Sequence, residues 1–334
     1  MIGTSHAYFI GIGGIGMSAI ARYLHAEGVN VAGYDRTDSE LIAQLKASGM
    51  SISAGASEAE ALAHFNRWLD EVPHERALVV RTPAVPDDFP VLVRARESGC
   101  RMGKRSEVLG WLTENAPTLA VAGTHGKTTT SALLAHLMNG QPSGCRAFIG
   151  GILVGTQSNT VLSPNAEWTV VEADEFDRSF LHLHPTHAAI TSADPDHLDI
   201  YGDVASFHEG FRAFTERISG TLFLEADVRI EGVTGKRYGV TTSRQEAEAW
   251  HAAATALRIE DGWLTGDVWI GGGWHEDVRF PLAGVHNVKN ALAALCLAES
   301  AGASVEGSLQ QLDAFQGIER RFAYHVRADH GIYI

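Results

Sequence analysis

The sequence predicts an α/β protein in which a parallel-sheet domain is followed by a second α/β domain that carries a small antiparallel sheet. Strand-like apolar runs alternate with helix-like runs along most of the 334 residues, as in parallel sheets covered by helices. Two glycine-rich turns, GIGGIG and GTHGKTT, each follow a strand-like run and precede a helix-like run. Turns of this kind place phosphate groups at helix N-termini.

The first domain opens with a βαβ unit, AYFIGIGGIGMSAIARYLHAEGVNVAGYD. Its helix has apolar residues at helical spacing and is closed by Gly28. Residues 55–74 are polar and alanine-rich, which favours a surface helix or loop. Further elements are predicted in order as a helix over 38–48, a strand over 77–81, and helices near 88–98 and 106–114. The step Asn115-Ala116-Pro117 is the predicted domain boundary, which gives domains of residues 1–115 and 116–334.

The second domain restarts the alternation at residue 118. Its predicted elements are a strand over 118–122, a helix over 127–138, strands over 167–172 and 187–192, a helix over 204–218 and a helix over about 285–301. Between 250 and 282, short alternating runs separated by Gly and Asp predict the antiparallel sheet, inserted or appended there. The chain ends on GIYI, a strand-like segment.

Bulk properties narrow the classes of function. A net charge of −14 disfavours nucleic acid or an anionic membrane as the main partner. The three cysteines, Cys100, Cys145 and Cys296, form no CxxC pair and predict neither disulfides nor a zinc site, which suits a cytoplasmic protein. The apolar segment at 7–24 has no basic leader and contains four glycines, which argues against a signal peptide or membrane span. The sequence does not indicate an oligomeric state.

The first glycine turn meets the full dinucleotide fingerprint. Gly11, Gly13 and Gly16 lie between a strand and a helix, and Asp35 ends the next strand 19 residues later. The fingerprint predicts a diphosphate at the helix N-terminus, from a nicotinamide, flavin or sugar nucleotide. A tight structural turn is the alternative.

The first turn therefore indicates a Rossmann-like first domain, and the second turn, GTHGKTT, indicates a P-loop-type ATPase domain after it. Lys127 and Thr128 fit the Walker pattern GxxxxGK[ST], with Gly126 before the lysine. The earlier glycine is absent, because position 121 is Val121 and Gly123 comes two residues late. The turn still offers backbone N–H groups, a lysine and a hydroxyl for a metal ion, so it predicts a bound nucleoside triphosphate.

Acidic residues follow the strand WTVVE. Triphosphate sites hold Mg²⁺ between the loop hydroxyl and a carboxylate at the end of a neighbouring strand, and Glu172 has that position. The alternative is a solvated acidic turn. That alternative, or a supporting role, is favoured for Asp174, Glu175 and Asp177.

A second acidic segment, ADPDHLD, follows the strand-like HAAIT. His197 lies among Asp194, Asp196 and Asp199, so imidazole and carboxylates could surround a second cation. A lone histidine would be assigned a structural role, and the carboxylates favour the metal instead.

Polar residues also open the helix near 285. His286, Asn287 and Asn290 lie in its first turns, where amides suit the edge of adenine, with helix capping by Asn287 as the alternative. Further on, Arg320 and Arg321 are adjacent, and one guanidinium could fork onto a transferred phosphate. Surface arginines are the alternative there.

Together these motifs resemble the Mur ligase family, the ATP-dependent amide-forming enzymes of peptidoglycan precursor synthesis. GTHGKTT, the strand-end EAD, the DH pair, HNVKN and RRF occur in the family's order along the whole chain. FIGIGGIGMSAIA, TPAV at 82–85 and KRSEVL at 104–109 are most similar to the branch that adds L-alanine.

The resemblance implies a role for each site residue. The UDP part of the substrate would be held by Gly11, Gly13, Gly14, Gly16, Asp35, Thr82 and Arg105. ATP would be held by Gly123, Thr124, His125, Gly126, Lys127, Thr128, Thr129, His286, Asn287 and Asn290. Two Mg²⁺ ions would be held by Thr128, Glu172 and His197, and catalysis would rest on Lys127, Glu172, His197 and Arg321.

The implied reaction activates the lactyl carboxylate of UDP-N-acetylmuramate as an acyl phosphate, which the amine of L-alanine attacks. Ser192 replaces the family's usual asparagine, and the carbamylated lysine of sister ligases has no counterpart around 208–213. The family's C-terminal domain, which helps to hold the amino acid, is expected to be absent, so little turnover is expected of this chain. The alternatives are a recycling ligase that adds a tripeptide, a non-catalytic nucleotide-sugar-binding protein and, least favoured, an NAD-linked dehydrogenase.

Overall fold

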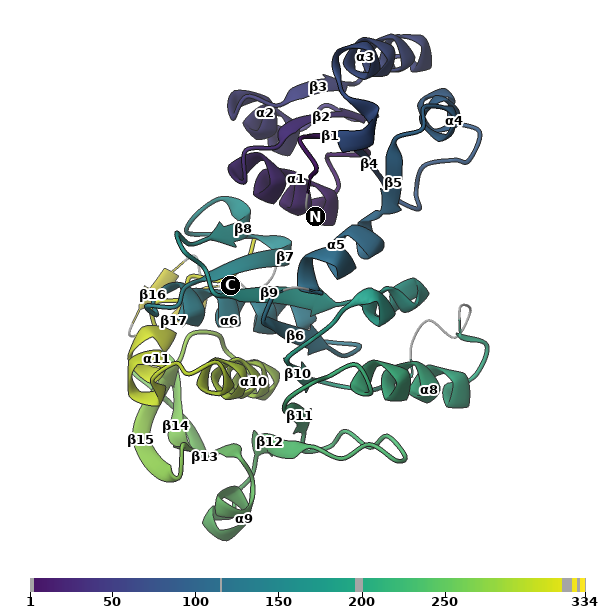
Figure 1. Cartoon of the computed structure of the whole chain (residues 1–334). Coiled ribbons are helices and arrows are strands. Elements are labelled where there is room, and N and C mark those ends of the chain that lie inside the picture. Colours follow the sequence, from purple (N-terminus) through teal and green to yellow (C-terminus); the bar gives the residue numbers. More distant parts are fainter. Residues whose placement is uncertain (1–2, 115, 196–200, 320–325, 329–330, 334) are drawn as a thin grey trace. The chain divides into compact units, whose positions relative to one another are not determined.

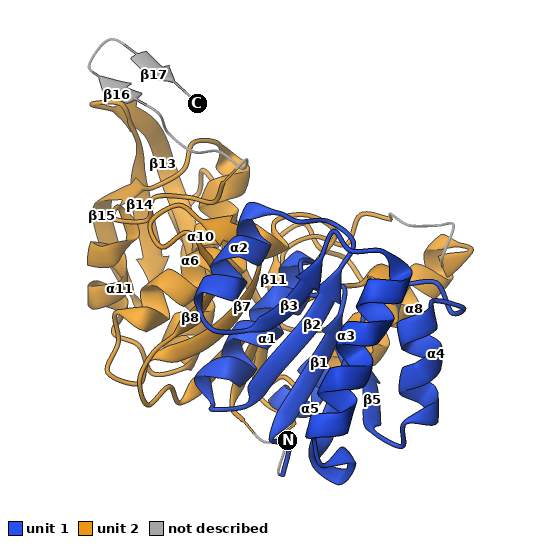
Figure 2. Ribbon diagram, turned by 90° about the horizontal axis from the view of Figure 1, so that it is seen from above, with its two compact units in different colours: residues 1–112 blue, residues 113–334 orange. Residues whose placement is uncertain are grey.

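A computed structural model describes residues 3–114, 116–195, 201–319, 326–328 and 331–333. The chain divides into two compact units, which we call the N-terminal unit (Met1–Leu112) and the C-terminal unit (Thr113–Ile334). Figure 1 labels the helices and strands, and Figure 2 colours the two units. Each unit is built on its own sheet, so the predicted α/β class is confirmed.

The N-terminal unit alternates strands and helices in the predicted way. Its strands are β1 (His6–Ile10), β2 (Asn30–Asp35), β3 (Ser51–Ala54), β4 (Ala77–Arg81) and β5 (Arg101–Lys104). Its helices are α1 (Ile15–Ala26), α2 (Glu40–Ala47), α3 (Glu58–Glu71), the short η1 (His74–Arg76), α4 (Pro90–Glu97) and α5 (Arg105–Thr113). All strands pair in parallel in the order β3-β2-β1-β4-β5. The predicted strand over 77–81 is confirmed, whereas β3 and β5 were not predicted.

Helix α3 differs most from expectation, because it is a core element and not a surface segment. Ser57 and Glu60 form a capping box at its start, and Ala61, Phe65, Trp68 and Leu69 are buried. These side chains form one helical stripe that packs on β1 and β2 together with α4. Helix α1 lies on the opposite face of the sheet (Figure 2).

The C-terminal unit has more elements than the sequence suggested. Its strands are β6 (Thr118–Ala122), β7 (Cys145–Leu153), β8 (Ser158–Leu162), β9 (Trp168–Ala173), β10 (His187–Ile190), β11 (Leu222–Glu225), β12 (Lys236–Val240), β13 (Ala252–Glu260), β14 (Trp263–Ile270), β15 (Gly273–Phe280), β16 (Val326–Ala328) and β17 (Gly331–Tyr333). Its helices are α6 (Lys127–Asn139), η2 (Phe176–His182), α8 (Val204–Thr215), α9 (Arg244–Ala249), α10 (Val285–Ser300) and α11 (Val305–Leu312).

Ten strands form one mixed sheet in the order β15-β14-β13-β12-β11-β10-β6-β9-β7-β8. The predicted antiparallel strands are present as β13, β14 and β15. They are not a separate sheet, because β13 pairs in parallel with β12 and so continues the central sheet. The parallel part, from β12 to β7, carries the ends of the strands on which the predicted site residues lie.

Helices on both faces bury this sheet. The long apolar helices α6 and α10 pack against one face together with α11, in one core cluster that includes Leu133, Leu137 and Leu292. Phe180 of η2 stacks on Phe214 of α8 in a second aromatic layer. Within the described residues, none of the helices has the length and apolar character needed to cross a bilayer.

Candidate functional site

The GTHGKTT turn joins the buried strand β6 to the N-terminus of α6. Strand β6 lies between β9 and β10, so three parallel strands end at the same edge of the sheet. Val121, which stands where the Walker pattern has its first glycine, is inside β6 and pairs with Glu172 and Ala189. The loop therefore begins two residues later than in the Walker pattern, at Gly123. Thr128 and Thr129 lie in the first turn of α6, as predicted.

Lys127 is fully engaged by protein atoms. Its Nζ donates to the carbonyl oxygen of Gly123 at 2.8 Å and to both carboxylate oxygens of Glu175, at 2.7 and 3.0 Å. A carboxylate oxygen of Asp174 lies 3.9 Å away. The Glu175 side chain is only 1% exposed. From its place in the sequence Glu175 is part of an acidic turn or a supporting residue, and the structure makes it the ion-pair partner of the loop lysine.

Glu172 is the penultimate residue of β9, and it lies beside the start of α6. Its carboxylate accepts hydrogen bonds from the hydroxyl of Thr128 at 3.2 Å, the hydroxyl of Ser131 at 3.1 Å and the backbone N–H of Gly150 at 2.6 Å. Burial raises the pKa of Glu172, and these neutral donors and Lys127 oppose that shift only in part. A buried carboxylate beside a hydroxyl is a set of hard oxygen donors, which fits Mg²⁺.

The segment after β10 holds the phosphate loop in place. The hydroxyl of Thr124 donates to the carbonyl oxygen of Asp194 at 2.7 Å, and the backbone N–H of His125 donates to the hydroxyl of Ser192 at 2.8 Å. The backbone N–H of Thr124 also donates to the carbonyl oxygen of Ser192. Ser192, whose replacement of an asparagine had no assigned consequence, thus shapes the loop through its hydroxyl.

Helix α10 contributes its first turns to the same site. Asn290 packs on the phosphate loop, since a Cβ atom at Gly126 would lie 2.4 Å from Oδ1 of Asn290. The Nδ2 of Asn290 donates to Oδ1 of Asn287 at 3.2 Å. Asn287 does not cap the helix, because the N-cap is Gly284 and Asn287 donates to the carbonyl oxygen of Ala283. His286 folds back over Gly284. That these side chains face adenine stays a prediction.

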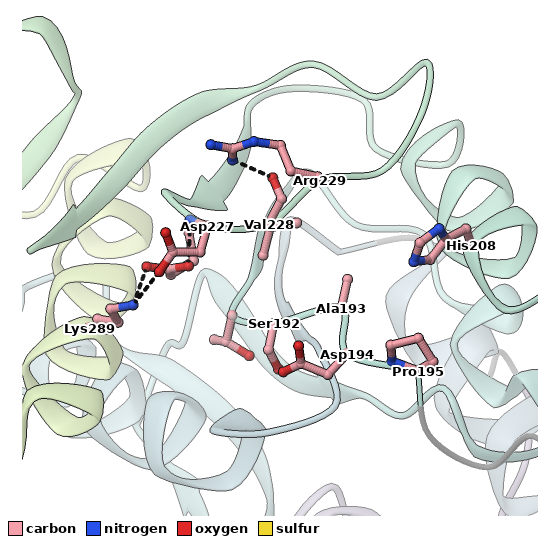
Figure 3. Close-up of a pocket in the computed structure, with 11 residues that line it drawn as sticks. Ser192, Ala193, Asp194, Pro195, His208, Asp227, Val228, Arg229 and Lys289 are labelled. Atoms are coloured by element: carbon pink, nitrogen blue, oxygen red, sulfur yellow. Dashed lines mark hydrogen bonds and ion pairs between the residues drawn. The ribbon is translucent and has the colours of Figure 1, made fainter. Parts of the chain in front are cut away.

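A cavity of about 420 Å³ adjoins the loop-supporting segment. Ser192, Ala193 and Asp194 line one side of it, Asp227, Val228 and Arg229 line the other, and Lys289 and His208 lie at its two ends (Figure 3).

Lys289 is fixed in the wall of this cavity by two carboxylates. Its ammonium lies 2.7 Å from Glu225 and 2.9 Å from Asp227. Burial lowers the pKa of Lys289, but these two partners outweigh burial and raise it. The cavity is therefore lined by charges of both signs next to the phosphate loop.

In the N-terminal unit, the GIGGIG turn joins β1 to α1 and is shaped by the predicted acid. Gly11 has a φ of +89°, a left-handed conformation that favours glycine. The backbone N–H of Gly13 donates to Oδ2 of Asp35 at 2.7 Å, and Gly14 is the N-cap of α1. Asp35 thus organises the turn itself, and its contact with a ligand stays a prediction.

Two further predicted residues lie against this turn. A Cβ atom at Gly11 would lie 2.8 Å from Cγ2 of Thr82, and one at Gly16 would lie 2.6 Å from Nη1 of Arg105. Thr82 follows β4, and Arg105 opens α5 directly after β5. The structure therefore brings a guanidinium, which can fork onto phosphate oxygens, to the start of α1.

Two predicted catalytic residues, His197 and Arg321, lie outside the described residues, as do Asp196, Asp199 and Arg320. Among the residues that are described, no three His, Cys, Asp or Glu side chains gather as a metal site. Within the described chain, the predicted metal ligands are thus represented by Thr128 and Glu172.

Comparison with protein families gives two matches. The Mur ligase middle domain matches residues 121–298, and the Mur ligase family catalytic domain matches residues 6–116. The two matched ranges together contain both glycine turns and Glu172.

Individual relatives share most of the chain. UDP-N-acetylmuramate–L-alanine ligase of Flavobacterium psychrophilum is 42% identical over 98% of this chain and 70% of its own length. The structure of the Thermotoga maritima UDP-N-acetylmuramate–alanine ligase superposes with a TM-score of 0.80 at 29% identity, over 96% of this chain and 71% of that one. The structure of a murein peptide ligase of Psychrobacter arcticus superposes with a TM-score of 0.77 at 25% identity, over 95% of this chain and 69% of that one.

Proposed function

The chain belongs to the Mur ligase family, and we propose that it is an ATP-dependent ligase that joins L-alanine to the lactyl carboxylate of UDP-N-acetylmuramate. The observation that carries the proposal is the arrangement around Lys127. A phosphate loop, its lysine and a buried carboxylate beside a hydroxyl meet at one sheet edge, in the unit that matches the family's middle domain. A second glycine turn with an arginine beside it lies in the other unit.

ATP and UDP-N-acetylmuramate are assigned to different units. Gly11, Gly13, Gly14 and Gly16 with Thr82 and Arg105 would hold the UDP part of the sugar nucleotide, with Asp35 fixing the turn. The backbone of residues 123–129 and the ammonium of Lys127 would hold the β- and γ-phosphates of ATP. The cavity beside Ser192 and Lys289 supports a position for the nucleoside end next to α10.

The chemistry proceeds in two steps. A lactyl carboxylate oxygen attacks the γ-phosphorus of ATP, ADP leaves, and an acyl phosphate forms. The amine of L-alanine then attacks the acyl carbon, phosphate leaves with the C–O bond electrons, and the nitrogen loses a proton. Mg²⁺, held by Thr128, Glu172 and His197, would neutralise charge on the phosphoryl oxygens. Lys127, and Arg321 by family resemblance, would orient the transferred group, and fixed reactants avoid a large entropic barrier.

L-Alanine is favoured over an intact tripeptide as the amine substrate. The relative whose name specifies L-alanine is 42% identical to this chain, whereas the murein peptide ligase is 25% identical.

Cys100, Cys145 and Cys296 are free and buried, which supports a reducing cytoplasm as the location of the reaction.

Release of phosphate by the complete gene product tests the choice of substrate. With ATP, Mg²⁺ and UDP-N-acetylmuramate present, L-alanine is expected to stimulate release, and the tripeptide is not. Stimulation by the tripeptide alone would assign the recycling reaction. UDP-sugar binding without phosphate release under either condition would favour the non-catalytic alternative.

Gly126→Ala is expected to weaken ATP binding on the order of tenfold. The added Cβ would lie 2.4 Å from Oδ1 of Asn290, and the φ of +85° is strained for alanine. The phosphate loop and helix α10 must therefore move apart. Gly232→Ala is the matched control, because its φ is +78° but the nearest atom would be 3.8 Å away, at Arg212. Calorimetric titration of both variants with Mg·ATP compares them. Equal ATP affinity in the two variants would show that contact with Asn290 does not shape the site.

A further inference from the structure

We propose that Glu175 makes nucleotide binding dependent on Mg²⁺, because it neutralises Lys127 and adds negative charge to the phosphate site. The inference rests on the proposed function, since it takes the loop as the ATP site. The inference assigns a role to Glu175, which lies outside both glycine turns, GIGGIG and GTHGKTT. Glu175 is a positioning residue in this account, since it acts through the lysine.

The ammonium of Lys127 has no hydrogen to spare in the structure. It has three N–H donors, and these serve Gly123 and the two oxygens of Glu175 at 2.7 to 3.0 Å. A phosphate oxygen can accept from this ammonium only if the bond to Gly123 or Glu175 is given up. The neighbouring Asp174 lies farther off, at 3.9 Å, and its side chain is 39% exposed.

Glu175 cannot easily release the lysine by turning to solvent. Its side chain is buried, and its backbone is fixed at the start of η2. The buried hydroxyl of Tyr201 donates to the carbonyl oxygen of Glu175 at 2.6 Å, and the backbone N–H of Arg178 donates to the same oxygen at 3.0 Å. The carboxylate therefore remains in the site whether or not Lys127 moves.

The charges around the lysine disfavour a bare triphosphate. The carboxylates of Glu175 and Asp174 lie 2.7 and 3.9 Å from the ammonium of Lys127, and a third carboxylate, that of Glu172, lies beside Thr128 at the same edge of the sheet. ATP without metal carries about four negative charges, and Mg·ATP about two, so the same carboxylates repel the bare form about twice as strongly. A cation bound at Thr128 and Glu172 would offset this repulsion, whereas bare ATP meets it in full.

Glu175→Gln tests the inference through the ratio of two dissociation constants, for ATP in EDTA and for ATP in excess Mg²⁺. Glutamine keeps the shape and one acceptor for Lys127 but removes the charge. We expect the affinity for metal-free ATP to rise on the order of tenfold and the affinity for Mg·ATP to change less. The dissociation constant in EDTA divided by that in excess Mg²⁺ therefore falls. An unchanged or larger ratio in Glu175→Gln would overturn the inference.

Two further variants separate charge from packing. Glu175→Asp keeps the charge and is expected to keep the wild-type ratio; a ratio as low as that of Glu175→Gln would contradict a charge effect. Glu276→Gln removes the same charge from an exposed position on β15, 68% accessible, and should also keep the ratio.

If the wild-type chain binds no ATP even with Mg²⁺, the proposed function fails. If it binds Mg·ATP and only the ratio fails to fall, this inference alone is wrong.

Discussion

Lys127→Ala is expected to weaken Mg·ATP binding on the order of 100-fold. Truncating one partner of a buried hydrogen-bonded charge pair costs about 2–5 kcal/mol, and each 1.4 kcal/mol is tenfold in affinity. Lys127 is the cationic side chain whose ammonium lies directly at the loop, 2.8 Å from the carbonyl oxygen of Gly123. Calorimetry with Mg·ATP measures the loss, and the affinity for UDP-N-acetylmuramate should stay at its wild-type value.

The control for this variant must address the carboxylate that it leaves behind. Lys127→Ala strands the buried charge of Glu175, which could destabilise the C-terminal unit. The double variant Lys127→Met, Glu175→Gln removes both charges and should still bind Mg·ATP poorly. Lys236→Ala, on an exposed lysine at the start of β12, should bind normally. Wild-type ATP affinity in the double variant would show that the lysine does not contact phosphate.

Glu172→Gln is expected to raise the Mg²⁺ concentration needed for half-maximal ATP binding on the order of 100-fold. The change keeps the shape and one oxygen acceptor for Ser131, Thr128 or the backbone N–H of Gly150, so the fold should be preserved. It removes the negative charge that would ligate the cation, and a neutral amide is a much weaker ligand. A Mg²⁺ titration at fixed ATP gives the shift.

Glu167→Gln is the matched control for that variant. Glu167 is an exposed carboxylate just before β9, so its loss alters net charge equally but leaves the strand end intact. Its Mg²⁺ titration should overlay that of the wild type. An unchanged Mg²⁺ requirement in Glu172→Gln would remove Glu172 from the metal site and leave it a structural carboxylate.

The sequence could predict the strand, loop and helix around Lys127 because their signals are local. Five consecutive residues of β6 are buried, and the glycine loop and apolar α6 follow directly. The same holds for β1, the GIGGIG turn and α1. In both places the order of strand, glycine turn and helix is itself the structural signal.

Elements whose signal depends on distant partners were missed. Strands β11 and β12 are short and carry charged residues, and they are strands because β11 pairs with β10, and β12 pairs with β11 and β13. Helix α3 was expected to be polar at the surface, because alanines and charges obscure the spacing of Phe65 and Trp68. Their burial depends on β1 and β2, which lie far away in the sequence.

The roles of Glu175 and Ser192 could not have been predicted from local pattern. In the sequence Glu175 is one of several acids after a strand, and only the fold brings it to Lys127, 48 residues earlier. Ser192 likewise meets His125 across neighbouring strand ends. Asn290 was predicted from its amide in the first turns of a helix, and its position against Gly126 follows from the packing of α10 on α6.

Calorimetric titration of this chain with UDP-N-acetylmuramate and with Mg·ATP, each alone and then in sequence, tests the central claim most directly. We expect one site for each ligand, with Arg105→Ala weakening the binding of the sugar nucleotide alone and Lys127→Ala weakening the binding of ATP alone. Competition between the two ligands for one site, or failure of either to bind the wild-type chain, would contradict a ligase that holds its two nucleotides on separate glycine loops.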